Sequence, residues 1–385
     1  MAGQQRRLRV GVVGIGFVGA AHVDAIRRIT QAEVVAVASS TSERAHQHAA
    51  ALGIPRAYAD YRALVADPDI DVVHNCTPNV LHHPVNRAII EAGKACFSEK
   101  PLTMTAAEAD DLVRLAEATG VPTAVNFNHR GFPQAQEMRA MIASGEIGAV
   151  HAVHGSYLQD WLLFDTDWNW RLDPTQGGTT RVIGDIGSHW MDLAQHLTGS
   201  RIVSVMADLG TLFQTRQRPD GPIETFQRAD DMARVPVAID TEDFASVLVR
   251  FENGARGSFT VSQVSAGRKN RLSLQVDGGS GALAWCSEES ELLWRGSRTG
   301  PSQTLQRNPG QAQLPSLSRL PAGHAEGWPD ALANVVRGFY EQVQEAERRP
   351  WVASLEDGAY GMHLVEAILE SSRTERWVHL TPPPA

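Results

Sequence analysis

Acidic and imidazole side chains recur at helical spacing within one stretch of this sequence, GDIGSHWMDLAQH, which begins at Gly184. Its four candidate residues, separated by four, three and four positions, are Asp185, His189, Asp192 and His196. A helix would place them on one stripe. Histidine is the side chain best matched to proton transfer near neutral pH, and a carboxylate one turn away can orient it or hold a neighbouring hydroxyl. The stretch therefore favours acid–imidazole pairs on the wall of a cleft.

Two other interpretations of the same stripe stay open. The stripe is also typical of a solvated helix face, where His196 in particular is expected. Asp185, His189 and Asp192 also have a spacing that metal ligands can adopt. Neither a nearby cysteine nor an HExxH pattern accompanies them, however. We therefore expect no metal at this stripe.

Lys100, in the tripeptide Glu99-Lys100-Pro101, is the next residue with candidate chemistry. It follows Ala95 to Ser98, a short apolar stretch that predicts a buried parallel strand. An ammonium group at this strand end would hydrogen-bond a substrate hydroxyl and stabilise the alkoxide that develops as hydride leaves carbon. Pro101 would hold the turn, with a cis peptide bond as one option. The alternative is an ordinary surface lysine in a loop.

Aromatic and polar side chains are mixed in the segment from Tyr157 to Arg171, YLQDWLLFDTDWNWR, which holds three of the nine tryptophans within ten residues. Pyranose and cyclitol rings stack their C–H faces on indole and need donors and acceptors around the rim. Core packing at a domain junction is the alternative, and we favour it for any single tryptophan. For the segment as a whole we favour substrate binding. The predicted substrate contacts are Tyr157, Gln159, Trp161, Trp170 and Arg171, with Arg130 and His324 from other segments.

The stretch from Arg9 to Gly19, RVGVVGIGFVG, is the element that must position these groups. An apolar strand ends in Gly14, Gly16 and Gly19 and a helix follows, which is the context of a dinucleotide-binding turn. The first glycine turns the chain, the second lets backbone approach a pyrophosphate, and the third lets helix and strand pack closely. The helix N-terminus then offers N–H groups to the phosphates. The predicted cofactor contacts of this turn are Gly14, Gly16, Phe17, Val18 and Gly19.

The residues after the second predicted strand, Val34 to Ala38, bear on the choice of cofactor. In NAD-binding folds an acid near that strand end holds the ribose hydroxyls of the adenosine. Here Ser39 and Ser40 stand in its place, and no acid occurs before Glu43. An anion that would repel a 2′-phosphate is missing, and Arg44 could reach one. We therefore expect NAD or NADP, with a weak lean to NADP; the alternative is that Arg44 is simply solvated.

Short apolar strands alternate with helices through the first third of the chain, which predicts a doubly wound parallel sheet covered on both faces. We expect a helix from the glycine turn to about Thr30, strands at 71–77, 95–98 and 122–127, and helices at 81–92 and 106–118. Ligand chemistry in such sheets lies beyond the carboxyl ends of the strands. The residues at those ends, which predict one site built from several loops, are Thr77, Pro78, Asn79, His82, Glu99, Lys100 and Asn128.

From Asn128 onward the pattern changes to strands that follow one another. After a helix at 133–144, alternating residues predict strands at 150–158, 202–212, 244–251, 256–264, 272–276 and 282–285. Asn253-Gly254 between two of them is a hairpin signal. Strands without intervening helices imply an open antiparallel sheet. We also expect long loops at 214–240 and 295–327, helices at 329–345 and 355–372, and a last strand near Trp377.

Length and composition set the class of protein. At 385 residues the chain is too long for one hydrophobic core, so two domains are expected, 1–128 and 129–385. Apolar residues make up 43% and charged residues 21%, and no apolar segment is long enough to span a bilayer. A net charge of −9 argues against non-specific binding of nucleic acid. We therefore expect neither a nucleic-acid partner nor a membrane.

Two further features bear on the cellular compartment. Cys76, Cys96 and Cys286 are scattered without metal or redox spacing, which predicts small buried residues in reducing surroundings. Arg6-Arg7 before an apolar run resembles a twin-arginine signal. That run is also the first strand–helix unit, and its removal would destroy the predicted nucleotide site. We expect a cytoplasmic protein that keeps its N-terminus.

Four motifs together resemble one enzyme family across nearly the whole chain. They are the glycine turn, Thr77-Pro78-Asn79 followed by His82, Glu99-Lys100-Pro101, and Asp185-x-Gly187-x-His189-x-x-Asp192. This set resembles the Gfo/Idh/MocA family, which is named after glucose–fructose oxidoreductase and inositol dehydrogenase. The first motif is shared with many dehydrogenases, whereas the last two in combination are specific. The segment Tyr157 to Trp161 is similar to that of the levoglucosan-dehydrogenase-like branch, which oxidises pyranose rings.

The resemblance implies a fold, a cofactor and a set of roles. An N-terminal Rossmann domain would bind NAD(P), and the C-terminal sheet would bind a carbohydrate and form a homodimer or homotetramer. Lys100, Asp185 and His189 would be catalytic. Two departures from the family pattern matter: the pair Gly177-Gly178 lies farther upstream of Asp185 than usual, and the acid after the second strand is missing.

Our hypothesis is an NAD(P)-dependent dehydrogenase of a sugar, glycoside or cyclitol. His189 would take the hydroxyl proton, Lys100 would hold the oxygen, and Asp185 would fix both the hydroxyl and the imidazole. A glycoside-cleaving enzyme that keeps its NAD and oxidises the substrate only transiently is the alternative with the same site. A non-enzymatic cofactor sensor is a third, and the joint presence of the three catalytic candidates argues against it.

Overall fold

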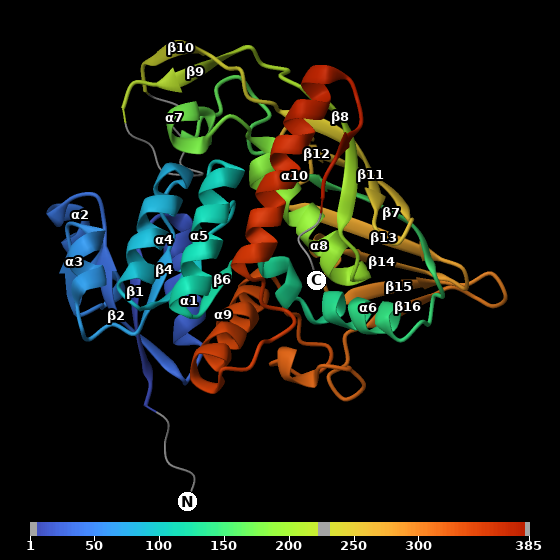
Figure 1. Ribbon diagram of the computed structural model, residues 1–385, viewed down its shortest axis with the longest axis horizontal. Coiled ribbons are helices and arrows are strands. Elements are labelled where there is room, and N and C mark those ends of the chain that lie inside the picture. Colours follow the sequence, from blue (N-terminus) through green and yellow to red (C-terminus); the bar gives the residue numbers. More distant parts are fainter. Residues whose placement is uncertain (1–5, 222–231, 382–385) are drawn as a thin grey trace, which may run out of the picture. The chain divides into compact units, whose positions relative to one another are not determined.

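The computed structural model describes residues 6–221 and 232–381 and divides the chain into two compact units (Figure 1). Unit 1 contains the chain up to Asn128 together with Leu332–Ala359, and unit 2 contains His129–Ala331 and the chain from Tyr360 onward. The segment Leu332–Ala359, which we had expected within a domain at 129–385, therefore belongs to unit 1. Each unit is described below by itself.

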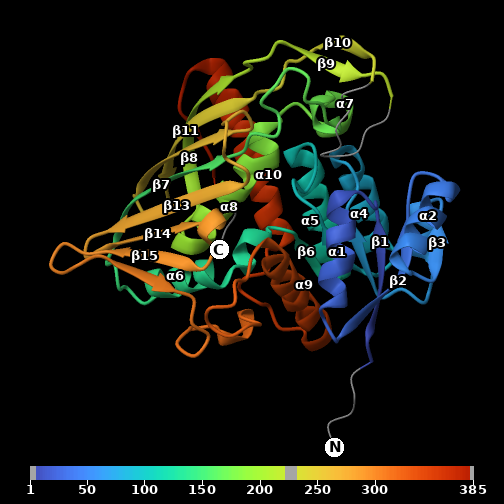
Figure 2. The ribbon, with the colours of Figure 1, turned by 180° about the vertical axis from the view of Figure 1, so that it is seen from behind.

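Unit 1 is built on a six-stranded parallel sheet with the order β3-β2-β1-β4-β5-β6. The strands are β1 (Leu8–Val13), β2 (Ala32–Ala38), β3 (Arg56–Tyr58), β4 (Val72–Asn75), β5 (Ala95–Ser98) and β6 (Thr123–Val125). The helices between them are α1 (Phe17–Arg27), α2 (Ser42–Leu52), α3 (Tyr61–Ala66), α4 (His82–Glu91) and α5 (Ala106–Thr119). Figures 1 and 2 show α4 and α5 on one face of the sheet and α1 on the other. The predicted doubly wound sheet is confirmed.

Local sequence explains why these elements start and stop where they do. Val10 and Val12 of β1 are fully buried, as expected for a central strand that is covered on both faces. The Thr105 side chain accepts a hydrogen bond from a backbone N–H in the first turn of α5, and Gly120, at a φ of 66°, ends that helix in the left-handed conformation. The same cap pair, Thr41 and Gly53, bounds α2.

Unit 2 is built on a nine-stranded sheet with the order β16-β15-β14-β13-β7-β12-β11-β8-β17. The strands are β7 (Val150–Leu158), β8 (Ile202–Gly210), β11 (Phe244–Phe251), β12 (Arg256–Ser262), β13 (Arg271–Gly278), β14 (Ala282–Cys286), β15 (Leu292–Gly296), β16 (Gln303–Gln306) and β17 (Val378–His379). All neighbours are antiparallel except β7 and β12, which run parallel. The predicted large, mostly antiparallel sheet is therefore confirmed.

Helices α6 (Pro133–Ala143) and α8 (Ser188–Thr198) pack against this sheet. Trp190 of α8 stacks on Phe259 of β12 with 4.5 Å between ring centroids, and its indole N–H donates to the carbonyl of Ser273. Both rings are buried, so they anchor α8 on the sheet. This anchoring fixes the helix that carries His189.

Two long helices follow the sheet in sequence. Helix α9 (Trp328–Glu345) lies mostly in unit 1, and α10 (Leu355–Thr374) begins in unit 1 and continues into unit 2. Their predicted bounds were within two residues of these at each end. Among the described residues, no helix combines the length and the apolar character needed to cross a membrane.

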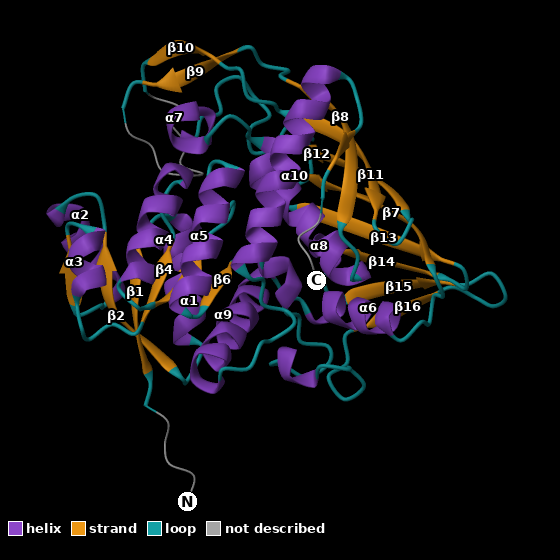
Figure 3. Ribbon diagram, viewed as in Figure 1, coloured by secondary structure: helices purple, strands orange, loops and turns teal. Residues whose placement is uncertain are grey.

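The predicted loops at 214–240 and 295–327 contain strands, which corrects our expectation. A two-stranded antiparallel hairpin, β9 (Thr215–Pro219) and β10 (Arg234–Ala238), occupies the first loop, while residues 222–231 lie outside the described chain. β16 lies in the second loop, which also contains the end of β15. Figure 3 distinguishes these strands from the surrounding loops. Polar sequences such as TRQRP and QTLQ lack the alternation that identifies a half-buried strand.

Candidate active site

The glycine turn of unit 1 has the geometry that a dinucleotide needs. Gly14 has a φ of 87°, and a Cβ there would lie 2.6 Å from the Cys76 carbonyl oxygen. A Cβ at Gly19 would lie 2.0 Å from the Gly14 carbonyl oxygen, so the strand and α1 pack as closely as predicted. A Cβ at Gly16 would instead meet no described protein atom within 4 Å. Gly16 therefore leaves the open backbone that the predicted approach of a pyrophosphate requires.

The start of α1 also suits an anion. In the part of the chain that the structure describes, the first turn of α1 contains no acidic residue, and no side chain caps it. Phe17 at the helix start is 55% exposed. Asn128 adds a second fitting feature, because its buried amide Nδ2 has no hydrogen-bond partner among the described residues. These residues of unit 1 fit a dinucleotide cofactor.

The residues after β2 are exposed or half-buried, as a ribose-binding strand end would require. Ser39 donates its backbone N–H to the Tyr58 carbonyl, while Ser40 and Arg44 are exposed. Thr41 caps α2 by accepting from the Arg44 backbone N–H at 3.2 Å. Arg44 therefore lies in the first turn of α2, six residues after the end of β2.

His82 ties together two of the strand-end loops in unit 1. Its Nδ1 lies 2.6 Å from the Pro101 carbonyl oxygen and its Nε2 lies 2.9 Å from that of Thr77. Burial lowers the pKa of His82, although the two carbonyl contacts oppose the shift. Both ring nitrogens face carbonyl oxygens, so in this structure His82 holds the loops after β4 and β5. The Lys100–Pro101 peptide bond is cis, as the sequence analysis allowed.

Glu99, next to Lys100, ends a buried hydrogen-bonded chain that has no sequence signature. The contacts are Glu99 Oε1 to His22 Nε2 at 2.9 Å, His22 Nδ1 to His74 Nδ1 at 2.9 Å, and His74 Nε2 to the Tyr340 hydroxyl at 2.8 Å. With Glu99 ionised and both imidazoles neutral, each contact has one donor: Tyr340 donates to His74, His74 to His22, and His22 to Glu99. This series of hydrogen bonds fixes the Glu99 carboxylate beside Lys100.

The surroundings of Glu99 keep it ionised. Burial alone would raise its pKa, but the hydrogen bond from His22, the charge of Lys100 and the hydrogen bond from the Asn126 amide lower it on balance. Its Oε2 also accepts the Lys100 backbone N–H at 3.2 Å. The Lys100 side chain is half-buried. A fixed negative charge thus adjoins the residue predicted to stabilise an alkoxide.

In unit 2, the predicted stripe is interrupted at its start. Asp185 lies in a π-helical turn, Ile183–Gly187, and only the later members lie on α8. π-turns are often found at functional sites because they redirect a side chain. Asp185 Oδ1 accepts from Arg171 Nε at 3.1 Å, and its Oδ2 accepts from Gln263 Nε2 at 2.8 Å. Each carboxylate oxygen therefore has its own donor.

His189 is paired with a second imidazole. Its Nδ1 lies 3.3 Å from His129 Nδ1, and the two rings are 4.7 Å apart at 71°. In this contact the Nδ1 of one ring must carry the proton and donate, and the Nδ1 of the other ring must accept. Proton exchange with a substrate would then use the other nitrogen of His189, Nε2. His129 was not among the predicted residues.

Asp192 and His196 are bonded within the protein. Asp192 accepts from Arg130 at 2.9 and 2.5 Å in a bidentate pair, and both side chains are buried. Gln136 donates its amide to His196 Nε2 at 2.8 Å. His196 is only 9% exposed, so our expectation that it lies on a solvated face was wrong. Arg130, predicted to bind substrate, uses its guanidinium to fix α8.

The aromatic segment is held by one amide from outside it. Asn270 Oδ1 accepts from the Tyr157 hydroxyl at 2.6 Å and from Gln159 Nε2 at 2.8 Å. Gln159 in turn accepts from the Trp161 indole at 2.8 Å. Burial, followed by the negative charge of Asp185, raises the pKa of Tyr157. These contacts place Tyr157 and Gln159 in one polar group near Asp185.

The tryptophans of this segment divide between two environments. Trp161 and Trp168 pack against the buried cluster of Leu162, Leu172 and Ile239, so the core-packing alternative applies to them in part. Trp170 lies under the Arg171 guanidinium, 4.3 Å from ring centroid to carbon. That guanidinium also donates to Asp185. The segment therefore brings an indole next to the candidate catalytic carboxylate.

Gly177 allows the chain to close tightly behind Arg171. A Cβ at Gly177 would lie 2.8 Å from the Arg171 carbonyl oxygen, and Gly178 has a φ of 98°. The glycine pair thus ends the short helix α7 (Pro174–Gly177), despite its unusual distance from Asp185 in the sequence. His324 is exposed, and its carbonyl accepts from Arg307. Among the described residues, no hydrogen bond joins it to the residues around Asp185.

Groups of histidine, cysteine, aspartate and glutamate large enough to hold a metal ion are absent from the described ranges 6–221 and 232–381. The Asp192 carboxylate, one of the three possible ligands considered, is bound to Arg130. The cysteines Cys76, Cys96 and Cys286 are not joined in disulfides.

Buried histidines predict loss of stability in acid. Burial lowers the pKa of His74, His82 and His196, and the charges of Arg130 and Arg139 add to the effect at His196. The unfolded chain binds these protons below about pH 6.5, whereas the folded chain does not. Stability is thus present above that pH and lost as pH falls. Below that pH, we expect the unfolding free energy to fall by at most about 1.4 kcal/mol per pH unit for each histidine that stays neutral in the folded chain.

Urea unfolding followed by circular dichroism at pH 7.5, 6 and 5 measures this slope. The variant His196→Gln keeps an acceptor for Gln136 but cannot titrate, so its slope should be shallower by one histidine's share. An unchanged slope in this variant would show that His196 is not the source.

Comparison with known proteins gives a consistent result for both units. Residues 8–127 match the profile of the oxidoreductase family with an NAD-binding Rossmann fold, and residues 135–284 match the GFO/IDH/MocA C-terminal domain. Levoglucosan dehydrogenase of Pseudarthrobacter phenanthrenivorans is 29% identical over 97% of this chain and 98% of its own. An uncharacterized oxidoreductase of Bacillus subtilis is 30% identical over 89% of this chain and 86% of its own.

Solved structures of the same kind of protein are similar to this chain over nearly its whole length. Levoglucosan dehydrogenase in complex with NADH and levoglucosan has a TM-score of 0.87 at 26% identity, covering 97% of this chain and 99% of that chain. An inositol dehydrogenase homolog from Azotobacter vinelandii, complexed with NAD+, has a TM-score of 0.84 at 28% identity, covering 97% and 98%.

Proposed function

Because this chain belongs to the GFO/IDH/MocA family of NAD-binding oxidoreductases, we propose that it oxidises a hydroxyl-bearing ring carbon of a sugar, glycoside or cyclitol. The observation that carries the proposal is the contact between Trp170, Arg171 and Asp185. One short segment supplies both an indole on which a pyranose ring could stack and the guanidinium that holds a carboxylate. The names of the relatives, levoglucosan dehydrogenase and myo-inositol 2-dehydrogenase, point to the same substrate class.

The cofactor is NAD(H), and unit 1 contains the residues to hold it. The backbone around Gly16 and the start of α1 would bind the pyrophosphate, and the amide of Asn128 would be satisfied by a polar group of the ligand. When bound, the nicotinamide supplies the acceptor for the hydride. We propose that the protein also accepts NADP, because serines replace the acid after β2 and Arg44 follows.

Three side chains are proposed to act on the substrate hydroxyl. His189 accepts its proton at Nε2, since Nδ1 is engaged by His129. Asp185, held by Arg171 and Gln263, accepts a hydrogen bond from the hydroxyl and sets its direction. Lys100 stabilises the oxygen as negative charge grows on it. In the reverse direction the same groups return the proton.

A substrate panel tests the proposal. Levoglucosan, glucose, methyl glucosides and inositols are incubated with NAD and NADP in parallel, and reduction is followed by absorbance of the reduced cofactor. Net reduction in step with oxidised sugar supports the proposal. Release of an aglycone without net reduction would indicate the glycoside-cleaving alternative. Binding of the cofactor without turnover on any sugar or cyclitol would indicate a sensor.

The choice of cofactor gives a separate prediction. Ser39→Asp should raise the KM for NADP by about tenfold or more and change the KM for NAD by much less, because a carboxylate at the end of β2 repels a 2′-phosphate and accepts from ribose hydroxyls. Steady-state kinetics with each cofactor measure both constants. Equal changes for the two cofactors would mean that the end of β2 does not contact the ribose.

We also propose that the protein forms a homodimer or homotetramer through one face of the nine-stranded sheet. Leu248 of β11 and Trp294 of β15 are 50% and 38% exposed. The pairing register puts them on one cross-strand row through Ser258, His154, Gln275 and Ala284, so they share a face. Light scattering coupled to size exclusion gives the mass, and Leu248→Lys should lower it.

A further inference from the structure

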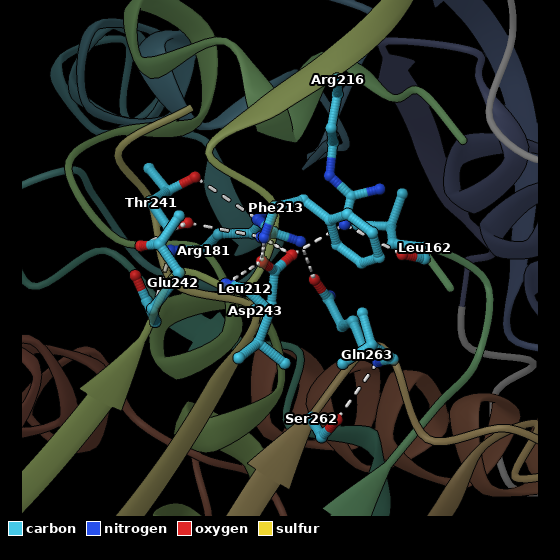
Figure 4. Close-up of polar contacts among 12 residues, drawn as sticks. Leu162, Arg181, Leu212, Phe213, Arg216, Thr241, Glu242, Asp243, Ser262 and Gln263 are labelled. Atoms are coloured by element: carbon cyan, nitrogen blue, oxygen red, sulfur yellow. Dashed lines mark hydrogen bonds and ion pairs between the residues drawn. The ribbon is translucent and has the colours of Figure 1, made fainter. Parts of the chain in front are cut away.

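A buried charge cluster in unit 2 surrounds Asp243, the residue before β11 (Figure 4), and Gln263 connects it to Asp185. At its centre is the Asp243 carboxylate, which is fully buried together with two arginines, Arg181 and Arg216. Asp243 Oδ1 accepts from both guanidinium groups, at 2.8 Å from Arg216. Its Oδ2 accepts the backbone N–H groups of Leu212 and Phe213 at 2.8 and 3.0 Å. The carboxylate therefore has a donor for each of its four lone-pair directions.

This cluster is electrically balanced. Glu242, also buried, accepts from the backbone N–H groups of Arg181 and Ile183 at 3.0 and 2.9 Å. Two arginines are thus matched by two carboxylates. Burial alone would raise the pKa of Asp243, but the charge of Arg181 and the hydrogen bonds lower it on balance. A balanced cluster with this many hydrogen bonds holds its members rigidly.

Gln263 connects the cluster to the candidate catalytic carboxylate. It is fully buried, and its Oε1 accepts from Arg181 Nη1 at 3.2 Å. Arginine can only donate, so this contact forces the amide nitrogen to the opposite side. That nitrogen donates to Asp185 Oδ2 at 2.8 Å. The amide orientation is therefore set by Arg181 rather than by Asp185 itself.

Arg216 connects the same cluster to the aromatic segment. Its Nη1 donates to the Phe164 carbonyl at 2.7 Å, and its Nη2 donates to the Leu162 carbonyl at 2.9 Å. Leu162 lies one residue after Trp161. Asp243 therefore anchors, through one arginine each, both the loop proposed to bind the sugar and the amide that holds Asp185.

We propose that Gln263 is a positioning residue for the reaction: it fixes the rotation of the Asp185 carboxylate, and Arg181 fixes the amide of Gln263. The inference rests on the proposed function for the role of Asp185. Without Gln263, Asp185 Oδ2 loses the donor at 2.8 Å that sets its direction, while the contact of Oδ1 with Arg171 remains. Oδ2 would then no longer be held for the substrate hydroxyl.

Gln263→Glu is the decisive variant. It keeps the shape of the side chain and strengthens the contact with Arg181, so we expect the fold to survive. It replaces the donor with a carboxylate oxygen 2.8 Å from Asp185 Oδ2. At pH 9 both groups are ionised and repel, and kcat should fall by about 10- to 100-fold. At pH 6 a proton held between the two carboxyls restores a donor, and the loss should shrink.

Two comparison variants separate the loss of the donor at position 263 from the general effect of adding a negative charge. Gln263→Met offers no donor at any pH, so its loss of kcat should be the same at pH 6 and 9. Gln47→Glu makes the same chemical change at an exposed position of α2, where Gln47 Nε2 donates to Glu43 at 3.3 Å. It should leave kcat and its pH profile unchanged. If Gln263→Glu and Gln263→Met both keep the kcat of the parent protein, the inference is overturned.

Thermal unfolding provides a test that does not depend on activity. Asp185 is paired with the charged Arg171 at 3.1 Å, and its own negative charge acts on the ionisable hydroxyl of Tyr157. A second carboxylate raises the pKa of the pair in the folded state, so its stability is present at low pH and lost as pH rises through that raised value. Gln263→Glu should therefore lower Tm more at pH 8 than at pH 5.

The Asp185→Asn background separates the two claims. In Asp185→Asn, the additional pH dependence of Tm caused by Gln263→Glu should vanish, because residue 185 no longer carries a negative charge. If it persists, Gln263 does not act on Asp185 and the inference fails. If Asp185→Asn alone keeps full turnover, the proposed role of Asp185 fails instead, while the Tm comparison still decides whether Gln263 holds that carboxylate.

Discussion

Replacing Lys100 with methionine is expected to lower kcat by about 10²- to 10³-fold, which is the usual cost of removing one donor that stabilises an oxyanion. Methionine has a similar length and apolar stem but carries neither charge nor donor. The lysine stabilises an oxygen whose charge appears only as hydride leaves, so most of the loss should fall on kcat. The measurement is steady-state turnover with the best substrate of the panel at saturating cofactor.

The binding of NADH should change little in Lys100→Met. Its pyrophosphate would be held by the glycine turn and by α1, which the substitution does not touch. Fluorescence titration gives the Kd for NADH, expected within a few-fold of the parent value. Lys269→Met is the matched control, because that lysine is 77% exposed and pairs with Asp160 on the surface. Near-normal turnover of Lys100→Met would refute the role given to this lysine.

The surroundings of Lys100 show where motif-based prediction ends. The tripeptide Glu99-Lys100-Pro101 stands out because it follows a short apolar strand. The hydrogen-bonded series from Glu99 through His22 and His74 to Tyr340 has no such local pattern. Each residue that bonds the next is 52 to 266 positions away in the sequence. A contact of that kind depends on which strands become neighbours, and a local pattern carries no information about it.

The parallel sheet of unit 1 could be predicted closely for a physical reason. Its central strands are buried on both faces and therefore consist of short apolar runs, and glycine is required where the chain turns at Gly14. The missed elements α2, β3 and α3 lie at the sheet edge, where polar residues dilute the signal. In unit 2 the polar strands β9 and β16 were missed for the same reason, and β10 and β15 were missed as well.

Within the candidate site, the sequence draws attention to residues with reactive groups, but not to several of the residues that hold them. Asp185 and His189 attract attention because carboxylates and imidazoles can transfer protons. Gln263, Asn270 and His129 have no motif, and each makes its contact from a distant part of the chain. The error at His196 has a related cause: helical spacing alone cannot say whether a stripe faces water or another helix.

Replacing His189 with alanine is expected to lower kcat by about 10²- to 10⁴-fold, the range for loss of a positioned general base. The physical reason is that the hydroxyl proton must leave before or as hydride leaves, and water is a poor acceptor in a buried site. His189 is only 7% exposed and its Nδ1 is engaged by His129 at 3.3 Å. Turnover is measured with the same substrate and with sugar at saturation.

Chemical rescue distinguishes proton transfer from loss of structure. Alanine leaves a space the size of an imidazole next to His129, so added imidazole should restore part of kcat in His189→Ala in a concentration-dependent way. His189→Gln fills that space with an amide and should not be rescued. His363→Ala, which removes an exposed histidine of α10, should show neither loss nor rescue. Rescue requires a base rather than a filler, because an amide cannot accept the proton at this pH. If His189→Ala keeps its turnover, or if imidazole restores the glutamine variant equally, the proton leaves by another route.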